Sequence, residues 1–389
     1  MSELTYLEKL LDGVKVEWQT LGKVLKRTKG TKITAGQMKA LHKDNAPLKI
    51  FAGGKTVAFV DFKDIPEKDI NREPSIIVKS RGIIEFEYYD KPFSHKNEMW
   101  SYHSNNDAIS IKYIYYFLKI NEGYFQKIGG KMQMPQIATP DTDKFEVPIP
   151  CPDNPEKSLA IQSEIVRILD KFTALTAELT AELNMRKKQY NHYRDLLLSF
   201  EEGEVEWKML GDLGENLDSK RKPITSGLRE AGSIPYYGAS GIVDYVKDYI
   251  FDGDFLLISE DGANLLARNT PIAFSISGKS WVNNHAHVIK FDSYAERRYV
   301  EYYLNSIDLA PYISGAAQPK LNKKNLESIR IPNPSPEDKK RIVSILDKFD
   351  ALTNSINEGL PREIELRQKQ YEYYRDLLFS FPRPETASN

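Results

Sequence analysis

The chain has 389 residues, a net charge of −1, 41% hydrophobic and 28% charged residues, which is typical of a soluble globular protein with two or three domains. Its single cysteine, Cys151, excludes a disulfide framework and a zinc site built from cysteines. The first residues lack the basic and apolar regions of a signal peptide, and no apolar run approaches the roughly 18 residues of a membrane span. We therefore expect a cytoplasmic protein without membrane contact.

Two short segments of nearly the same sequence open the two halves of the chain. Val-Glu-Trp-Gln-Thr-Leu-Gly at 16–22 returns as Val-Glu-Trp-Lys-Met-Leu-Gly at 205–211. The recurrence predicts two related halves. Trp18 and Trp207 hold the same place in this pattern, so we expect both to be packing anchors where each variable module meets the helices.

The first half continues with a basic module of mixed structure. Residues 75–78 and 82–86 are strand candidates, and residues 111–118 are a helix candidate. Residues 19–150 hold 21 basic and 15 acidic residues, a net charge of +6. This charge favours contact with a polyanion. The proline-rich stretch 147–152 predicts an extended exit from the module, because proline disfavours helix in the residue before it.

A long amphipathic helix is predicted next. Apolar residues recur in steps of three, four and seven from Ile165 to Phe200, and neither Gly nor Pro interrupts 156–202. A helix over 162–200 would span ~58 Å. It contains Thr-Ala-Glu-Leu twice, at 176–179 and 180–183. Because each unit adds ~6 Å of helix, or one to two base pairs of duplex, the segment has the properties of a ruler.

The second half repeats the plan with a different module. Strand candidates lie at 255–259 and 287–291, a helix candidate at 297–305, and a proline-rich exit at 329–334. Lys-Tyr-Ile-Tyr-Tyr-Phe-Leu at 112–118 parallels Arg-Tyr-Val-Glu-Tyr-Tyr-Leu at 298–304. The two modules therefore share a framework and differ in the residues that it carries.

The helical module is also repeated. Residues 165–176 return at 342–353, and residues 186–200 return at 367–381. The second copy lacks the Thr-Ala-Glu-Leu units and carries Gly359-Leu-Pro361, which should end one helix and start the next. The expected fold is α+β, with two globular α/β domains separated by two long helical, antiparallel coiled-coil regions in a pseudo-twofold repeat. The expected boundaries are 1–22, 23–150, 151–204, 205–334 and 335–389.

Several short motifs resemble parts of catalytic or cofactor-binding sites, but each lacks a residue or a spacing that such a site requires. Gly53-Gly54-Lys55-Thr56 lacks the glycine that a phosphate-binding loop requires at position 49, and Gly278-Lys279-Ser280 lacks it at 273. The chain has no Asp/Asn-Pro-Pro-aromatic tetrad of an amino-methyltransferase. His285 and His287 could share a strand face as metal ligands, but a hydrogen-bonded histidine pair near Asn283 and Asn284 is the simpler interpretation. We expect no metal site.

Clusters of cations, aromatics and amides in the two modules are candidates for DNA contact, with charged surface loops as the alternative. Cations suit phosphates, and amides suit adenine. The candidate residues are Lys26, Arg27, Lys29, Lys32, Lys79, Arg81, Ser219, Lys220, Arg221, Lys222, Tyr236, Tyr237, Ser240, Asn283, Asn284 and His285.

The repeated helices are slightly acidic, since residues 151–207 hold 7 basic and 11 acidic residues. An acidic helix is a poor phosphate binder, so we expect these helices to meet protein. The side chains expected to do so are Phe172, Leu179, Leu183, Tyr190, Tyr193, Phe349, Tyr371 and Tyr374.

The repeated Ile-Val-x-Ile-Leu-Asp-Lys-Phe and Gln-Tyr-x-x-Tyr-Arg-Asp-Leu-Leu blocks, with the tandem Thr-Ala-Glu-Leu units, resemble the specificity subunits of type I restriction–modification systems, above all the type IC branch. The resemblance covers about 147–211, 329–389 and the start of the chain. It implies a non-catalytic subunit that binds a two-part asymmetric target in double-stranded DNA, with one variable module for each half-site.

The resemblance also implies partners. Two methyltransferase subunits would dock on the helices, and two restriction–translocation subunits would join them. S-adenosylmethionine, ATP and Mg²⁺ would be bound by these partners, and none of them by this chain. As a separate hypothesis, the N-terminal residues 6–11 would pack near the C-terminal helix and make the arrangement circular.

Three other interpretations remain open at this point. The chain could be the specificity subunit of a related type II system, which has the same design. A self-sufficient methyltransferase or nuclease would need a cofactor loop and catalytic motif. A pure protein scaffold would not need the charge of +6 in the first module.

Overall fold

The computed structural model describes residues 13–131, 133–315, 318–355 and 357–381. The chain forms two compact units. The first unit comprises Met1–Glu178 and Glu365–Asn389, and the second unit comprises Leu179–Ile364. None of the described helices combines the length and the apolar character needed to cross a membrane.

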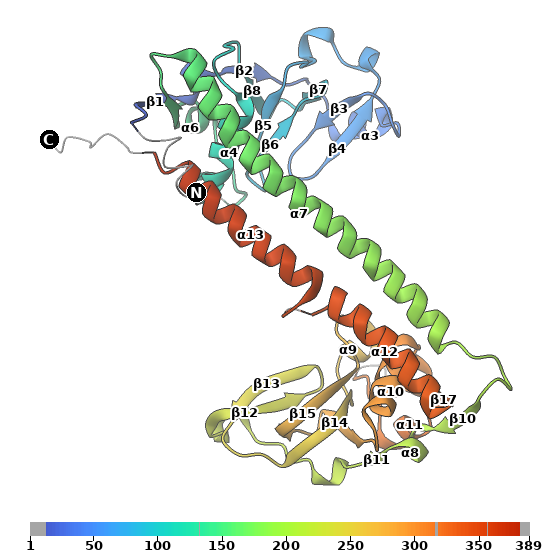
Figure 1. Cartoon of the computed structure of the whole chain (residues 1–389). Coiled ribbons are helices and arrows are strands. Elements are labelled where there is room, and N and C mark those ends of the chain that lie inside the picture. Colours follow the sequence, from blue (N-terminus) through green and yellow to red (C-terminus); the bar gives the residue numbers. More distant parts are fainter. Residues whose placement is uncertain (1–12, 132, 316–317, 356, 382–389) are drawn as a thin grey trace. The chain divides into compact units, whose positions relative to one another are not determined.

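The two larger sheets among the described residues of the first unit have four and three strands (Figure 1). Four antiparallel strands form one in the order β2-β8-β5-β6, with β2 at Lys26–Lys29, β8 at Trp100–His103, β5 at Ser75–Lys79 and β6 at Glu85–Tyr89. Three strands form the other in the order β4-β3-β7, with β4 at Val57–Val60, β3 at Leu48–Phe51 and β7 at Phe93–His95. The apolar run in β5 is buried throughout, as expected for a central strand.

Helices complete the first unit. Its helical elements are α2 (Leu21–Val24), α3 (Ala35–Leu41), η1 (Phe62–Asp64), η2 (Glu67–Asp69), α4 (Ile111–Ile120), α5 (Glu122–Gly129) and α6 (Thr139–Asp143). Tyr113, Ile114, Phe117 and Leu118 of α4 are buried in the main core. The predicted helix at 111–118 is confirmed, and Ser110 caps it by accepting a hydrogen bond from the backbone of Tyr113.

The second unit contains one mixed sheet of six strands in the order β11-β16-β14-β15-β12-β13. The strands are β11 (Glu215–Asn216), β12 (Ala231–Gly238), β13 (Gly241–Val246), β14 (Phe251–Ser259), β15 (Ala273–Val282) and β16 (Ala286–Lys290). The helical elements are α8 (Leu210–Leu213), η3 (Asp218–Lys220), η4 (Ser226–Leu228), α9 (Asn264–Ala267), α10 (Tyr294–Ser306), η5 (Ala310–Tyr312) and α11 (Lys323–Glu327). Two predicted strands, at 255–259 and 287–291, and the predicted helix at 297–305 are therefore confirmed, with ends that differ by at most four residues.

One predicted strand is displaced. Residues 82–86 were expected to be extended, but β6 begins at Glu85. Gly82 has φ +79° and belongs to a tight turn after β5, so the strand can begin only after the turn is complete.

Each unit has an equivalent pair of antiparallel strands, formed by the first and last strands of the unit. In the first, β1 (Val16–Thr20) pairs with β9 (Glu146–Pro150) and places Trp18 opposite Pro148. In the second, β10 (Glu206–Met209) pairs with β17 (Arg330–Asn333) and places Trp207 opposite Pro332. Both tryptophans pack on their unit's core, which confirms them as anchors. The proline-rich exits are extended because they form these pairs.

Three helices carry the repeated sequence: α7 (Pro155–Leu198), α12 (Pro336–Thr353) and α13 (Gly359–Leu378). The predicted long helix is confirmed, and it starts earlier than expected because Pro155 is compatible with a first helical turn. The predicted break after α12 is confirmed at Gly359, which has φ +76°. A Cβ there would lie 2.3 Å from the carbonyl oxygen of Ala351, so only glycine fits.

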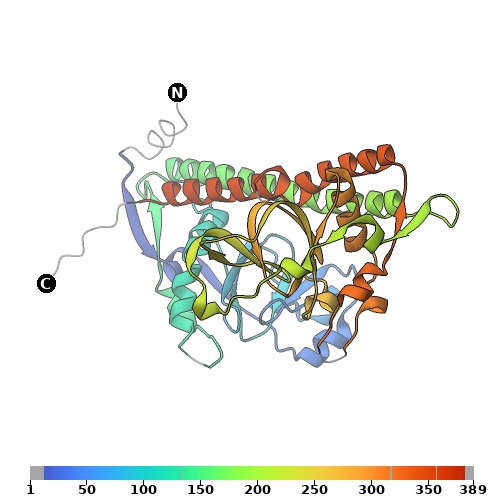
Figure 2. The same cartoon turned by 90° about the horizontal axis from the view of Figure 1, so that it is seen from below.

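The helical repeats are exchanged between the units. In the first unit, residues 155–178 of α7 lie beside the end of α13 (Figures 1 and 2). Leu378, Phe379 and Phe381, at the end of this segment, are buried in the core of the first unit. In the second unit, the end of α7 lies with α12, and Leu198 is buried in that core. Each unit therefore combines the beginning of one helical repeat with the end of the other. The segment predicted to close a circle, residues 6–11, lies outside the described residues.

Candidate nucleic-acid interface

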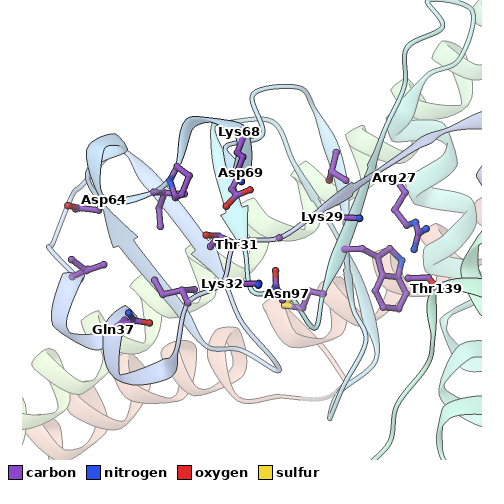
Figure 3. Close-up of a pocket in the computed structure, with 18 residues that line it drawn as sticks. Arg27, Lys29, Thr31, Lys32, Gln37, Asp64, Lys68, Asp69, Asn97 and Thr139 are labelled. Atoms are coloured by element: carbon purple, nitrogen blue, oxygen red, sulfur yellow. The ribbon is translucent and has the colours of Figure 1, made fainter.

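The first unit has a hollow of about 830 Å³ beside β2. Figure 3 shows its side chains, with Gln37 and Asp64 on one side and Arg27 and Thr139 on the other. Three predicted residues, Arg27, Lys29 and Lys32, line it, whereas Lys26 does not. The polar side chains that line the hollow are Arg27, Thr28, Lys29, Thr31, Lys32, Gln37, Asp64, Lys68, Asp69, Asn97 and Thr139.

Lys29 ends β2, and the loop that follows and carries Lys32 is held close to the sheet by Gly30. A Cβ on Gly30 would lie 2.3 Å from the carbonyl oxygen of His95, so a larger residue would push the loop outward. The backbone N–H of Thr31 donates to the same oxygen at 2.8 Å. The loop therefore presents its lysines from a fixed backbone.

Helix α3 borders the hollow and begins with a capping box. The Thr34 hydroxyl accepts a hydrogen bond from the Gln37 backbone, and the Gln37 side chain accepts one from the Thr34 backbone at 2.9 Å. This cap fixes Gln37 at the rim of the hollow, where its amide remains exposed.

The basic side chains of the hollow are available to an anionic ligand. Lys29, Lys32 and Lys68 are exposed, and no carboxylate among the described residues forms an ion pair with them. Arg27 lies 3.7 Å from the Asp143 carboxylate. Exposed, unpaired ammonium groups around a concave surface suit the phosphates of nucleic acid.

Lys79 lies elsewhere, inside the protein. Its side chain is 7% exposed, and its ammonium lies 2.6 Å from Glu85 and 2.8 Å from Glu87. Burial opposes the charge, but the hydrogen bonds to both glutamates raise the pKa of Lys79 above its usual value. Lys79 is therefore an internal counter-charge, and this placement disfavours the DNA contact that we expected for it. Arg81 is exposed and donates to the Gln136 side chain from Nε and Nη2, at 3.2 and 2.9 Å.

In the second unit the predicted basic segment, residues 219–222, has some side chains at the surface and one in the interior. Ser219, Lys220 and Lys222 are exposed. The Arg221 guanidinium is 12% exposed and lies 2.6 Å from Glu260 and 3.3 Å from Asp218. Arg221 thus holds the segment in place, which disfavours the phosphate contact that we expected for it.

Arg221 belongs to a charged cluster with Asp218, Glu260 and His287, whose carboxylates and ring could hold a metal ion by distance alone. His287 bonds Asp218 through Nδ1 at 2.6 Å and the Leu321 carbonyl through Nε2 at 2.7 Å. Because Arg221, together with Lys320 at 3.1 Å from Glu260, supplies the positive charge, the cluster is balanced as an ion-pair network.

The pKa values of both carboxylates reflect this network. Burial alone would raise the pKa of Asp218, but the hydrogen bond from His287 and the charges of His287 and Arg221 lower it below 3.8. Burial also opposes ionisation of Glu260, and Arg221, His287 and Lys320 lower its pKa below 4.5. Both groups are thus held as carboxylates.

The two histidines weighed as a metal pair lie in different surroundings. His285 is exposed and bonds the Asp261 carboxylate through Nδ1 at 2.8 Å, whereas His287 is buried. Asn283 is also buried, and its side chain accepts from the His285 backbone at 2.8 Å. Asn283 therefore shapes the turn, while Asn284 and His285 are exposed.

The remaining predicted DNA contacts lie on the β12–β13 hairpin. Tyr236 is 1% exposed and its hydroxyl accepts a hydrogen bond from the backbone of Ile224, so its role is structural. Tyr237 is half-buried, and Ser240 is exposed at the tip of the hairpin.

Sequence reasoning missed several residues of the first hollow. Gln37, Lys68 and Asn97 come from separate elements and join the predicted lysines only in the folded unit. One signal was present. Asn97 precedes β8, as Asn283 and Asn284 precede β16, so a comparison of the two modules would have found it.

The helix residues predicted to meet partners contact one another in part. Phe172 stacks on Tyr374 in the first unit, and Tyr193 stacks on Phe349 in the second. Tyr190 also lies against Phe349. Leu179, Leu183 and Tyr371 are half-buried. Exposed apolar side chains remain on the helices, at Leu175, Met185, Tyr193, Leu196, Leu366 and Tyr373.

Comparisons with known proteins agree with this architecture. A family model described as the type I restriction modification DNA specificity domain matches residues 15–186 and 202–366. The chain is 43% identical to the type I restriction enzyme EcoR124I/EcoR124II specificity subunit of Escherichia coli, over the full length of both proteins. It is 38% identical to the EcoprrI specificity subunit of the same organism, over 92% of this chain and 93% of that protein.

A solved structure has the same fold. The crystal structure of a type I restriction–modification S subunit from M. genitalium aligns with a TM-score of 0.65 at 16% identity, over 96% of this chain and 98% of the other. The resemblance to type IC specificity subunits is thereby confirmed, as is the α+β fold with an internal repeat. The chain belongs to the family of DNA specificity subunits of type I restriction–modification systems.

Proposed function

We propose that the chain binds an asymmetric two-part target in double-stranded DNA and that each unit reads one half-site. The observation that carries this proposal is the shared framework with different exposed residues. In both units cations lie at or beyond the end of the edge strand that pairs with β8 or β16. Lys29 ends β2 and Lys32 follows it, and Lys220 and Lys222 follow β11. Two units with the same framework and different exposed side chains are suited to recognising two different DNA sequences.

The continuous part of α7 would set the gap between the half-sites. It contains both Thr-Ala-Glu-Leu units, at 176–183, without interruption. A helix lengthens by ~6 Å for each four-residue unit, so its length is suited to fixing a spacing in DNA.

The helices would also dock two methyltransferase subunits. Their exposed apolar side chains, which include Met185, Leu196 and Tyr373 at 46%, 61% and 53%, support this role. In this arrangement the chain itself is non-catalytic. The methyltransferase subunits bind S-adenosylmethionine, and two restriction–translocation subunits bind ATP and Mg²⁺.

Binding-site selection tests the proposal. The full chain is co-expressed with methyltransferase subunits and incubated with a pool of randomised duplexes, and the bound DNA is sequenced. We expect two conserved blocks of different sequence at a constant separation. A complex that assembles but enriches no sequence would sink the recognition function. Methyl transfer by the isolated chain from labelled S-adenosylmethionine would contradict the non-catalytic role.

A further inference from the structure

The two units contain the same tight turn, built from residues that the sequence repeat does not cover. In the first unit, the Gly82 N–H donates to the Pro135 carbonyl at 2.9 Å, and the Ile137 N–H donates to the Ser80 carbonyl at 3.0 Å. In between, Arg81 pairs with Gln136 as an isolated bridge.

The second unit reproduces this bonding at equivalent positions. The Gly262 N–H donates to the Pro319 carbonyl at 3.2 Å, and the Leu321 N–H donates to the Glu260 carbonyl at 2.7 Å. The central bridge joins Asp261 to Lys320. Both turn glycines have positive φ, +79° and +102°. The backbone is thus the same, and the residue at its centre changes from a cation to an anion.

A second loop lies beside each turn, and a hydrogen bond to a backbone carbonyl of that loop holds the turn in place. The Ser80 hydroxyl is buried and donates to the Glu98 carbonyl at 2.6 Å. The Glu260 N–H donates to the His285 carbonyl at 2.9 Å. The Arg81 side chain is exposed and the Asp261 side chain is 34% exposed. Buried anchors under a side chain that reaches the surface suit a reading position, because a base edge must be met within a few tenths of an ångström.

The first turn presents a guanidinium in a defined plane. Nε and Nη2 of Arg81 both donate to the Gln136 Oε1, at 3.2 and 2.9 Å. An arginine has five N–H donors, so the outer pair on Nη1 and Nη2 remains for a ligand. A planar pair of donors matches the O6 and N7 acceptors of guanine in the major groove.

The second turn presents an acceptor. Asp261 accepts from His285 Nδ1 at 2.8 Å and retains further lone pairs. A carboxylate accepts from a base amino group, and it repels the O6 of guanine and the O4 of thymine. The bases that carry an amino group in the major groove are cytosine and adenine.

We propose that these turns are the equivalent base-reading positions of the two units. Arg81 reads a guanine in one half-site, and Asp261 reads a base with an amino group, cytosine or adenine, in the other. The inference rests on the proposed recognition function and names specificity-determining residues within it.

The experiment is the selection from randomised duplexes, repeated with the assembled complex carrying Arg81→Gln, Arg81→Asp or Asp261→Asn. For Arg81→Gln we expect the preference for guanine at one position of one half-site to fall on the order of 5- to 100-fold, with the other half-site unchanged. Arg81→Asp should shift that same position toward cytosine or adenine. Asp261→Asn should change one position in the other half-site alone.

Arg72→Gln is the matched control, since Arg72 is an exposed arginine paired with Glu67 at 2.7 Å outside the turn. It should leave every base preference unchanged. Gln136→Ala should reduce the guanine preference without abolishing it, because it removes the support of the guanidinium. Thermal unfolding of each variant checks that the fold is retained.

Three results would overturn the inference. If the unmodified complex selects a two-part target and Arg81→Gln weakens binding equally at all sequences, Arg81 is a phosphate contact, and the recognition function stands without this assignment. If the variants leave binding and preferences unchanged, the turns do not read DNA. An unmodified complex that selects no sequence refutes the recognition function and the inference together.

Discussion

The ring of Phe172 stacks on the ring of Tyr374, with centroids 5.3 Å apart and planes at 27°. The same contact occurs in the second unit, where Phe349 stacks on Tyr193 at 5.6 Å and 27°. Phe349 is the repeat equivalent of Phe172, and Tyr193 is the equivalent of Tyr374. Each contact therefore joins the start of one helical repeat to the end of the other.

The stack should be an energetic unit. In a double-mutant cycle, Phe172→Ala and Tyr374→Ala should couple by about 1 kcal/mol beyond their separate effects, because stacked aromatic pairs contribute that much beyond area burial. The free energy of unfolding is measured by urea denaturation. Phe172→Ala with Tyr193→Ala, which belong to different stacks, is the control and should be additive. Additive effects within the first pair would contradict a direct contact.

Asp170 and Asp347 hold the same place in the repeat, but we expect them to contribute unequally to the free energy of unfolding. Asp347 accepts from Tyr302 at 2.7 Å and from Arg298 at 3.0 Å, and the Arg298 side chain is 14% exposed. Asp170 accepts from Tyr116 at 2.5 Å and from Lys112 at 2.7 Å, and Lys112 is 33% exposed. Removing a partner from the more buried cation costs more.

We therefore expect Asp347→Ala to lower the free energy of unfolding by about 2 kcal/mol or more, and Asp170→Ala by about 1 kcal/mol. Chemical denaturation of the two single variants checks the order. Equal losses would show that the burial of the cation does not decide the cost.

In the basic segment 219–222 we expect Lys220 and Lys222 to affect DNA binding and Arg221 to affect stability. Lys220→Ala with Lys222→Ala should weaken DNA binding more at low salt than at high salt, and the salt slope should fall by about one for each phosphate that is no longer neutralised. Binding is measured by titration at several salt concentrations. A loss of affinity that is independent of salt would exclude a phosphate-binding role for these lysines.

Arg221→Ala should instead lower stability by about 3 kcal/mol, because it leaves Asp218 and Glu260 buried without their guanidinium. The double lysine variant serves as the control for Arg221→Ala, since the three cations are consecutive residues and each change removes positive charge from the same segment. An Arg221 variant with unchanged unfolding would contradict the buried geometry.

The same cluster predicts a loss of stability in acid. The pKa values of Asp218 and Glu260 are lowered on folding, so their contribution is fully present above their usual values of 3.8 and 4.5. It is lost as the pH falls through the lower folded values. The unfolding midpoints of the unmodified chain and of Asp218→Asn should therefore converge as the pH falls below 3.8 and through the lower folded pKa of Asp218. A difference that is constant with pH would rule this linkage out.

The spacer proposal predicts a change in the DNA target. Deleting residues 180–183 removes ~6 Å of α7 and should shorten the gap by one to two base pairs (about 3.4 Å each) while both half-sites stay the same. Selection from randomised duplexes measures this. Since the four residues amount to slightly more than one turn, the apolar stripe is nearly restored after the deletion. A changed half-site with an unchanged gap would refute the ruler.

Local patterns in the sequence determined much of this protein. The period of the apolar residues predicted α7, the Gly359-Leu-Pro361 break predicted the start of α13, and the recurrence of the Trp18 and Trp207 segments predicted the twofold plan. The helix and its break depend on the backbone preferences of residues near one another in the chain, and the twofold plan is visible because the same local pattern occurs twice.

The tertiary structure alone decided which polar residues are exposed. Lys79 and Arg221 are cations of the kind that contacts DNA, yet the fold buries both against carboxylates. The pairing of β5 with β6 sets Glu85 beside Lys79, and Glu260 lies against Arg221. Arg81 and Asp261 became equivalent only through hydrogen bonds to segments more than fifty residues away. The physical reason is that burial and ion pairing depend on neighbours in space, which the order of residues along a single chain does not show.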